Sequence, residues 1–455
     1  VATDVKFTVE RNVENKVTMK DAPSKLTVSK KDMADLAENL PGATFEVQDE
    51  NGDVVRTVYN ETLRWTTTAD ALVKTITGLK DGSYKLVETK APTGYTIADP
   101  ISFTVEKGKI YRSVDGEQAE IDTIAMEDQA TEVTISKTDI TTGKELPGAT
   151  LQILKKVKAA TDAGEEVEKE ETVITIYGEK LEWVSGETTK TIKGLPAGEY
   201  ILRETAAPNG YTIAKDVKFT VTDELKAAET VTMKDAAIEA VISKVDITNA
   251  EKELPGAELQ IMDTEGKEVV KTIFGEELKW TSAETAKQIK GLPAGEYILR
   301  ETKAPTGFAV AADVKFTISD DLTVENKVVM KDAPTDVTVS KVALTNETRE
   351  LPGAPLQILD EKGEIAKTVY GEQLSWISDV TAKVIKGLPA GTYTLREIAA
   401  PDGYALAEDV TFTVNTDGTT TKVVMKDDVT RVQISKMDVT NNKELAGAHL
   451  ALKDA

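Results

Sequence analysis

The sequence contains no cysteine and only one histidine, His449, among its 455 residues. The absence of cysteine excludes disulfide bonds and thiolate chemistry. A single histidine excludes a histidine-based catalytic triad and a multi-histidine metal site. No apolar run is long enough to span a bilayer, and we find neither a signal peptide nor an initiator methionine. We therefore expect a mature or excised segment that does not insert into a membrane.

The chain has few basic residues relative to acidic ones. It contains 55 lysines and arginines and 78 aspartates and glutamates, which gives a net charge of −23. A strongly acidic surface disfavours nucleic acid and anionic membranes as partners. The acidic stretch 49–53 lacks the full pattern of a calcium loop and fits a hairpin turn better. We expect no metal, no cofactor and no nucleic-acid partner.

What the sequence does contain is repetition. One marker is a strand pattern that ends in Ser-Lys and is followed by a Leu-Pro-Gly-Ala-type turn, and its copies lie about 100 residues apart. The lysines of this marker are Lys30, Lys137, Lys244, Lys341 and Lys436. A second marker is the pattern Val-x-Met-x-Asp, whose aspartates are Asp21, Asp235, Asp332 and Asp427, with Asp128 in a variant copy.

The order of the markers predicts the domain boundaries. Residues 1–22 match the last strands of a preceding repeat, and residues 429–455 match the first strands of a following repeat. Four complete repeats lie between them: 23–128, 129–235, 236–332 and 333–428. Because the linkers are very short, we expect the repeats to form an elongated, semi-rigid rod in which neighbouring repeats contact each other.

Within a repeat, two-residue alternation of apolar and polar side chains is common and helical periodicity is weak. Short strands separated by Gly, Pro and Asn turns predict an all-β fold, either a β-sandwich or a partly open barrel. The insertion 155–171 is predicted to be a solvated loop or a short helix. Each repeat also has a block with one tryptophan, which we interpret as a core or inter-repeat contact rather than a carbohydrate platform.

A third marker places a carboxylate at the end of an apolar row. In Tyr200, Leu202 and Glu204 the side chains point to one face of a strand, because successive side chains alternate between faces. The same rule turns Lys137 and Asp235 toward the core. Each repeat therefore sends one lysine, one glutamate and one aspartate inward.

Two interpretations account for three buried charges, whose burial costs several kcal/mol each unless they are paired or neutralised. The first is a salt-bridged triad. The second is a spontaneous amide between the lysine Nζ and the aspartate Cγ, since an apolar site lowers the pKa of an amine and raises that of an acid. The glutamate would then carry the proton from the amine to the departing oxygen. The residues alone leave both interpretations open.

The order of motifs resembles a known family. Ser-Lys-x-Asp, Glu-Leu-Pro-Gly-Ala, Glu-Thr-x-Ala-Pro-x-Gly-Tyr and Val-x-Met-x-Asp are similar to the Cna B-type (SpaA-like, prealbumin-like) domains of Gram-positive surface proteins. They also resemble the streptococcal fibronectin-binding-protein domain used for split peptide–protein ligation. The resemblance covers the four complete repeats and both end segments. It implies tandem prealbumin-like (Ig-like) β-sandwich domains, each with an isopeptide bond between its first and last strands.

The resemblance also implies which residues react. The crosslinks would be Lys30–Asp128, Lys137–Asp235, Lys244–Asp332 and Lys341–Asp427, promoted once each by Glu88, Glu204, Glu301 and Glu397. Many family members have Asn at the last position, whereas this chain has Asp, so the leaving group would be water. The first repeat departs most from the pattern. Asp21 and Lys436 have no partner within this chain.

The leading functional hypothesis is a structural stalk of a cell-surface adhesin, pilus or extracellular fibre of a Gram-positive bacterium, and not a turnover enzyme. Its partners would be neighbouring repeats or further copies of the protein, with any host or glycan ligand held by another region. In one alternative, the repeats themselves bind a host-matrix or glycan ligand. In another, the end strands join neighbouring copies into a filament.

Overall fold

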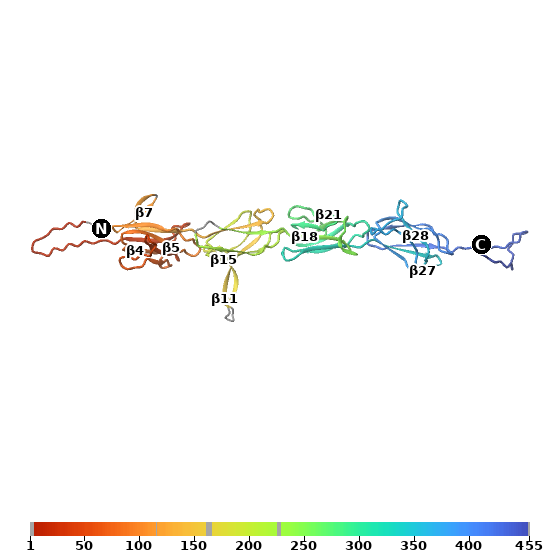
Figure 1. The fold of residues 1–455 in the computed structure, drawn as a ribbon, viewed down its shortest axis with the longest axis horizontal. Coiled ribbons are helices and arrows are strands. Elements are labelled where there is room, and N and C mark those ends of the chain that lie inside the picture. The colour runs from red at the N-terminus through yellow and green to blue at the C-terminus, as the bar shows by residue number, and fades with distance from the viewer. Residues whose placement is uncertain (1–3, 115, 161–165, 225–228, 454–455) are drawn as a thin grey trace. The chain divides into compact units, whose positions relative to one another are not determined.

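All regular elements are β-strands in the computed structural model, which describes residues 4–114, 116–160, 166–224 and 229–453 (Figure 1). The all-β prediction is therefore confirmed. Within the described residues no helix is long and apolar enough to cross a membrane. Contacts divide the chain into two compact units, Val1–Ile238 with Asp320–Thr323, and Glu239–Ser319 with Val324–Ala455. Each unit holds two repeats.

The first repeat is built from two sheets. One has the strand order β4-β1-β9 and the other β3-β2-β5-β6-β7-β8. Their strands are β1 (Lys25–Asp32), β2 (Thr44–Gln48), β3 (Arg64–Thr66), β4 (Val73–Thr77), β5 (Gly82–Lys90), β6 (Ile101–Glu106), β7 (Lys109–Val114), β8 (Glu117–Ile121) and β9 (Thr123–Asp128).

The second repeat has the same two-sheet plan. The orders are β14-β10-β17 and β12-β11-β15-β16, with β13 also paired to β11. The strands are β10 (Glu132–Asp139), β11 (Thr150–Ala160), β12 (Glu166–Thr172), β13 (Glu182–Val184), β14 (Lys190–Lys193), β15 (Gly198–Ala206), β16 (Val217–Val221) and β17 (Glu229–Asp235).

The third and fourth repeats share one arrangement. In the third, β18 pairs with β19, β22 and β25, and the other sheet has the order β21-β20-β23-β24; in the fourth, β26 pairs with β27, β30 and β33 beside the sheet β29-β28-β31-β32. The third repeat contains β18 (Glu239–Asp246), β19 (Asn249–Glu253), β20 (Glu258–Met262), β21 (Lys279–Thr281), β22 (Lys287–Lys290), β23 (Gly295–Lys303), β24 (Val314–Ile318) and β25 (Asn326–Asp332). The fourth contains β26 (Asp336–Ala343), β27 (Asn346–Glu350), β28 (Pro355–Leu359), β29 (Ser375–Ile377), β30 (Lys383–Lys386), β31 (Gly391–Glu397), β32 (Val410–Val414) and β33 (Thr421–Asp427).

In every repeat the first strand pairs in parallel with the last: β1 with β9, β10 with β17, β18 with β25 and β26 with β33. The remaining ladders are antiparallel. A parallel pair cannot be joined by a short hairpin, so the intervening strands form the second sheet before the chain returns. The beginning and the end of each repeat are thus neighbouring strands.

The core of each repeat lies between its two sheets. In the second repeat Val133, Ile135 and Met233 from one sheet pack against Leu151 and Leu202 from the other. These side chains occupy alternate positions along their strands, as the two-residue periodicity predicts. The tryptophans Trp65, Trp183 and Trp376 pack partly buried against the cores of their repeats. Their interpretation as core residues is confirmed.

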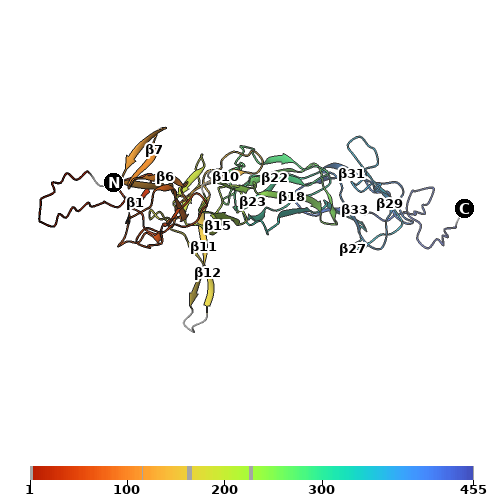
Figure 2. The ribbon, with the colours of Figure 1, turned by 60° about the vertical axis from the view of Figure 1, so that its left-hand side comes forward.

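Two repeats carry an extra pair of strands. In the first repeat the hairpin β7–β8 extends the larger sheet, and in the second repeat β11 and β12 continue as a two-stranded ribbon away from the sandwich (Figures 1 and 2). The insertion 155–171 was predicted to be a loop or a short helix, and in its described residues this is wrong. Lysines of β11 pair with glutamates of β12 across the ribbon, as in Lys156–Glu168 and Lys158–Glu166.

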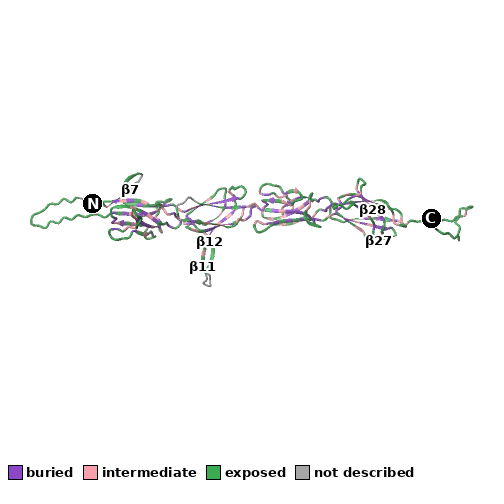
Figure 3. Cartoon of the chain, viewed as in Figure 1, coloured by how far each residue is buried: buried purple, intermediate pink, exposed green. Residues whose placement is uncertain are grey.

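The two end segments form no strands within residues 4–22 and 430–453, although the sequence predicts strands of flanking repeats there. Their apolar side chains are exposed, with Val9 at 68% and Val432 at 78% (Figure 3). The equivalent residues of the second repeat, Val221 and Val133, are buried. A strand needs a hydrogen-bonded neighbour, and nothing in the described chain supplies one to these segments.

Within each unit, the junction between repeats is short and closely packed. The Thr131 N–H donates to the Gly94 carbonyl of the first repeat (2.9 Å), while its hydroxyl donates to the Leu195 carbonyl of the second (2.6 Å). Thr335 makes the equivalent bonds in the other unit. Gly94 has φ +82°, and a Cβ there would lie 2.6 Å from Cγ2 of Ile176. Only glycine fits this junction.

Candidate functional site

The three ionisable residues that each repeat was predicted to send inward meet in its core. The lysine Nζ contacts Oδ1 of the aspartate and Oε1 of the glutamate, and its side chain is at most 2% exposed. The triads are Lys30, Glu88 and Asp128; Lys137, Glu204 and Asp235; Lys244, Glu301 and Asp332; and Lys341, Glu397 and Asp427, with lysine–glutamate distances of 3.0, 2.9, 2.8 and 2.8 Å. The irregular first repeat has the same triad as the others.

Three strands from two sheets build each triad. In the second repeat Lys137 lies on β10, and Asp235 is the last residue of the parallel neighbour β17. Glu204 reaches them from β15 in the opposite sheet. The Ile140 N–H donates to the Asp235 carbonyl (2.9 Å) and so fixes the end of β17 beside β10. The lysine and the aspartate are therefore held by the parallel ladder itself.

A backbone amide that the sequence did not single out orients each glutamate. Oε2 of the glutamate accepts an N–H from the alanine three positions after the aromatic residue of the Ala-Pro-x-Gly turn. These alanines are Ala98, Ala214, Ala311 and Ala407, at 2.8, 2.6, 2.6 and 2.8 Å. The recurring alanine was visible in all four repeats and could have been used as a signal. This bond leaves Oε1 free to face the lysine.

A second carboxylate lies beside three of the triads. Asp32, Asp139 and Asp246 follow their lysines by two positions and are buried, whereas the fourth repeat has Ala343 there. In the second repeat the Tyr211 hydroxyl donates to Asp139 (2.7 Å). The pKa of Asp139 is raised by burial but lowered more by hydrogen bonds from Tyr211, Thr141 and Thr142, so it is depressed overall. This carboxylate stays ionised.

The aspartate of the triad behaves in the opposite way. Burial raises the pKa of Asp128 to about 8 and the pKa of Asp235 and Asp332 to about 7, because the glutamate adds to the desolvation and the lysine only partly offsets it. The pKa of Asp427 is also raised by burial. A carboxyl group that keeps its proton near neutral pH can serve as an electrophile.

One oxygen of each triad lacks a hydrogen-bond donor. It is Oδ2 of the aspartate, for example in Asp235, while Oε1 of the glutamate meets only the lysine Nζ, at 2.9 Å in the second repeat. A bare carboxylate oxygen in an apolar core is costly, and a proton held between the two carboxyl groups removes that cost. The arrangement therefore places an amine, a protonated acid and a proton carrier within one closed site.

The raised pKa of Asp235 predicts how an unbonded repeat responds to pH. In Lys137→Met no amide can form, and the folded repeat binds a proton at Asp235 more tightly than the unfolded chain does. The stability that this proton contributes is complete below the ordinary pKa of 3.8 and is lost as pH rises toward the raised pKa of Asp235, which is about 7 with Lys137 present and higher without the lysine that lowers it. We expect the first urea transition of the full-length variant to move to lower urea between pH 5 and pH 8. A midpoint that rises with pH would contradict the raised pKa.

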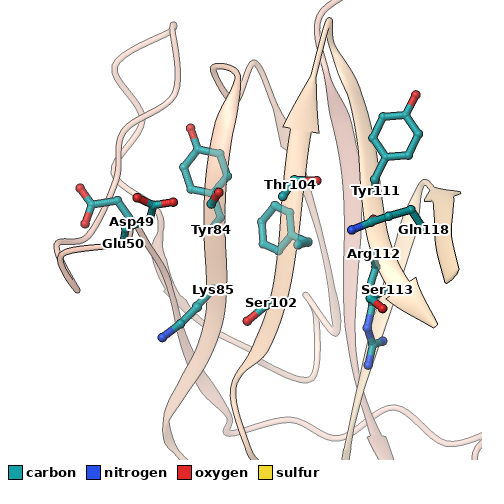
Figure 4. Close-up of a pocket in the computed structure, with 12 residues that line it drawn as sticks. Asp49, Glu50, Tyr84, Lys85, Ser102, Thr104, Tyr111, Arg112, Ser113 and Gln118 are labelled. Carbon is teal, nitrogen blue, oxygen red and sulfur yellow. The ribbon is translucent and has the colours of Figure 1, made fainter. Parts of the chain in front are cut away.

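A groove of about 330 Å³ lies on the outer face of the first repeat, over the sheet that β7 and β8 extend (Figure 4). Tyr111 and Gln118 of the hairpin stand on one side, Asp49 and Glu50 on the other. Lys85 also lines it and alternates along β5 with the inward row of Glu88, so the groove and the triad lie on opposite faces. Within the described residues no group of His, Cys, Asp and Glu is arranged to hold a metal ion.

Four segments of the chain match the model of the SpaA family, described as a prealbumin-like fold domain: residues 24–119, 131–237, 239–333 and 335–429. No curated protein matches the chain. Among solved structures, the Bacillus anthracis TIE protein is 20% identical over 86% of this chain and 70% of its own, with a TM-score of 0.35. The major pilin subunit of Bacillus cereus is 16% identical over 66% and 99%, with a TM-score of 0.30. A streptococcal ancillary pilin is 17% identical over 68% and 98%, with a TM-score of 0.24.

Proposed function

Because the chain belongs to the SpaA family of prealbumin-like domains, through four matches that together span most of its length, we propose that it is a structural stalk in which each repeat crosslinks itself. The stalk is part of an adhesin, pilus or other fibre on the outside of a Gram-positive cell. The observation that carries the proposal is the buried lysine, glutamate and aspartate triad in all four repeats.

The proposed reaction balances without any co-reactant. Nζ of Lys137, as the neutral amine, attacks Cγ of the protonated Asp235 carboxyl group. Glu204 accepts a proton from Nζ and gives it to the departing hydroxyl, so that the Cγ–O bond breaks and one water leaves. Glu204 ends in the protonation state in which it began. The reaction happens once and consumes its site, so the protein is not a turnover enzyme.

An amide explains the triad better than a permanent ion pair does. A buried ion pair must offset the desolvation of every charge, and replacing such pairs by neutral groups is often stabilising. The amide neutralises the lysine and the aspartate together. The link closes a loop of 98 residues in the second repeat, and by analogy with a disulfide of that length it stabilises the fold by about 4–5 kcal/mol.

The position of the link suits a load-bearing protein. Lys137 and Asp235 lie on β10 and β17, the strands through which the chain enters and leaves the repeat. Tension applied along the chain therefore passes through the amide and not through the hydrogen bonds of the sheets. The stalk needs no cysteine for this, which agrees with the composition.

The partners of the stalk are further repeats of the same kind. Phe7 and Val432 are exposed in segments whose pattern matches strands that are buried in complete repeats. Asp21 and Lys436 are also exposed, outside the four triads. We propose that these segments complete flanking repeats, either in a longer chain or in neighbouring copies.

The intact mass of the folded chain tests the proposal. We expect a mass lower than that of the sequence by four waters, one for each triad. Peptide mapping should then place the losses at the four lysine–aspartate pairs, such as Lys30 with Asp128. A mass equal to that of the sequence would leave four buried ion triads and would overturn the crosslinked stalk.

A further inference from the structure

Asp246, the second carboxylate of the third repeat, accepts a tyrosine hydroxyl from a different repeat than its equivalents Asp32 and Asp139 do. Asp32, Asp139 and Asp246 each lie directly opposite the reactive aspartate in the parallel ladder. Residues opposite each other in this way project from the same face, so each carboxylate is a neighbour of the triad. An ionised group at that place needs its own donors to stay buried without disturbing the triad.

In the first two repeats a tyrosine of the same repeat supplies one of these donors. Tyr95 donates to Asp32 (2.8 Å) and Tyr211 donates to Asp139 (2.7 Å). Both tyrosines end the Ala-Pro-x-Gly turn. The third repeat has Phe308 at this position, and its ring has no hydroxyl to donate.

The missing hydroxyl comes from the fourth repeat. The Tyr370 hydroxyl donates to Oδ2 of Asp246 (2.7 Å), while the N–H and the hydroxyl of Thr248 donate to Oδ1 (both 2.7 Å). The ring of Tyr370 packs edge-on against Phe308, with centroids 6.4 Å apart. Asp246 is therefore satisfied only when both repeats are folded and in contact.

Other contacts hold the fourth repeat in this place. The Val310 N–H donates to the Thr416 carbonyl (2.8 Å). Gly307 has φ +79°, and a Cβ there would lie 2.5 Å from Cγ1 of Val369, the residue before Tyr370. In the other unit, Tyr177 reaches Asp32 across the equivalent junction, at 3.4 Å. There Tyr95 already serves the carboxylate, so the contact is additional.

We propose that Tyr370 of the fourth repeat is a positioning residue for the triad of the third repeat, so that formation of the Lys244–Asp332 amide depends on the neighbouring repeat. The inference rests on the proposed crosslinking reaction. Without the hydroxyl, Asp246 is a buried anion that lacks one donor at the end of β18, opposite Asp332. The strand end and the approach of Nζ to Cγ are then less well fixed, and the reaction slows.

The test follows the four crosslinks separately in the full-length chain. Cell-free synthesis is stopped with denaturant at intervals, and the crosslinked peptides are quantified by mass spectrometry. In Tyr370→Phe the Lys244–Asp332 peptide should appear about tenfold more slowly, the size expected for one lost hydrogen bond to a charged group. The Lys341–Asp427 peptide should keep its rate, because Ala343 stands where the other repeats have the second carboxylate.

Two further variants separate positioning from a general loss of stability. Tyr177→Phe removes the equivalent hydroxyl where Tyr95 remains, and should change the Lys30–Asp128 rate less than twofold. Tyr370→Phe combined with Phe308→Tyr returns a hydroxyl at the place where Tyr211 has one, and should restore the Lys244–Asp332 rate. A rate that is unchanged in Tyr370→Phe, or that the double variant does not restore, would overturn the positioning role.

A failure of the crosslinking reaction itself would be seen first, as the absence of every crosslinked peptide from the parent chain. The positioning role is then measured by hydrogen exchange at Ile247, whose N–H donates to the Asp332 carbonyl (2.9 Å). We expect about tenfold faster exchange in Tyr370→Phe and recovery in the double variant. Equal exchange in all three chains would overturn the positioning role as well.

Discussion

Glu204→Gln should produce a full-length chain that is heavier than the parent by about one water, because the second repeat no longer forms its amide. A glutamine cannot accept the proton of Nζ or pass it to the departing hydroxyl, and losing a positioned acid–base group slows such reactions by about 10²–10⁴-fold. The glutamine side-chain carbonyl can still accept the Ala214 N–H, which Glu204 now accepts at 2.6 Å. We therefore expect the repeat to fold with its lysine and aspartate unreacted.

Glu199→Gln is the matched control for this experiment. Glu199 lies on the same strand, β15, but is exposed, so this variant should keep all four amides and should not regain a water. Peptide mapping should further show that the Lys30–Asp128, Lys244–Asp332 and Lys341–Asp427 peptides are unaffected by Glu204→Gln. If Glu204→Gln formed the amide at the rate of the parent, Glu204 would have no role in the reaction. Burial of the lysine and the aspartate would then be the sole cause of amide formation.

The sequence predicted the triads because a two-residue period determines which way a strand side chain points. Once Tyr200, Leu202 and Glu204 are taken as one row, the inward direction of the glutamate follows. Because the inward glutamate recurs in all four repeats, its position is constrained and is not a chance occurrence. The all-β class and the pairing of Lys137 with Asp235 depend on the same rule and on the resemblance to a known family.

Two hydrogen-bond donors to buried carboxylates were not predicted. The Ala214 amide and the Tyr370 hydroxyl act on side chains that only the folded chain brings close. The ribbon of β11 and β12 was missed because most of its residues from 155 onward are Lys and Glu, without a regular row of large apolar side chains to distinguish a strand from a loop. Its stability comes from pairs such as Lys156–Glu168, which need the register of both strands.

The end segments show the opposite case, in which the sequence predicts strands that the structure does not contain. Residues 4–22 carry a strand pattern as regular as that of a complete repeat, yet they form no strand in this structure. Local pattern specifies what a segment can become, and the hydrogen bonds of a neighbouring strand decide whether it does. Val9 and Val432 are exposed for this reason.

Asp235→Ala should convert the second repeat from a rigid element into one that extends under load. When the chain is pulled from its two ends, each crosslinked repeat transmits force through its amide and should not lengthen. In the variant, the 98 residues between positions 137 and 235 are no longer bypassed, so unfolding should add a single step of about 300 Å. Lys137 keeps its contact with Glu204 (2.9 Å), so the lysine is not left as an unpaired buried charge.

Single-molecule force spectroscopy measures this step directly. Lys234→Ala is the matched control, since Lys234 precedes Asp235 on β17 but is exposed, and it should leave the chain without any step. The chain enters the repeat through β10 and leaves it through β17, so an amide between these strands carries the tension past the rest of the repeat. Steps of this length in the parent chain would mean that its strands carry the load through hydrogen bonds, and the triads would then be ion pairs without a mechanical role.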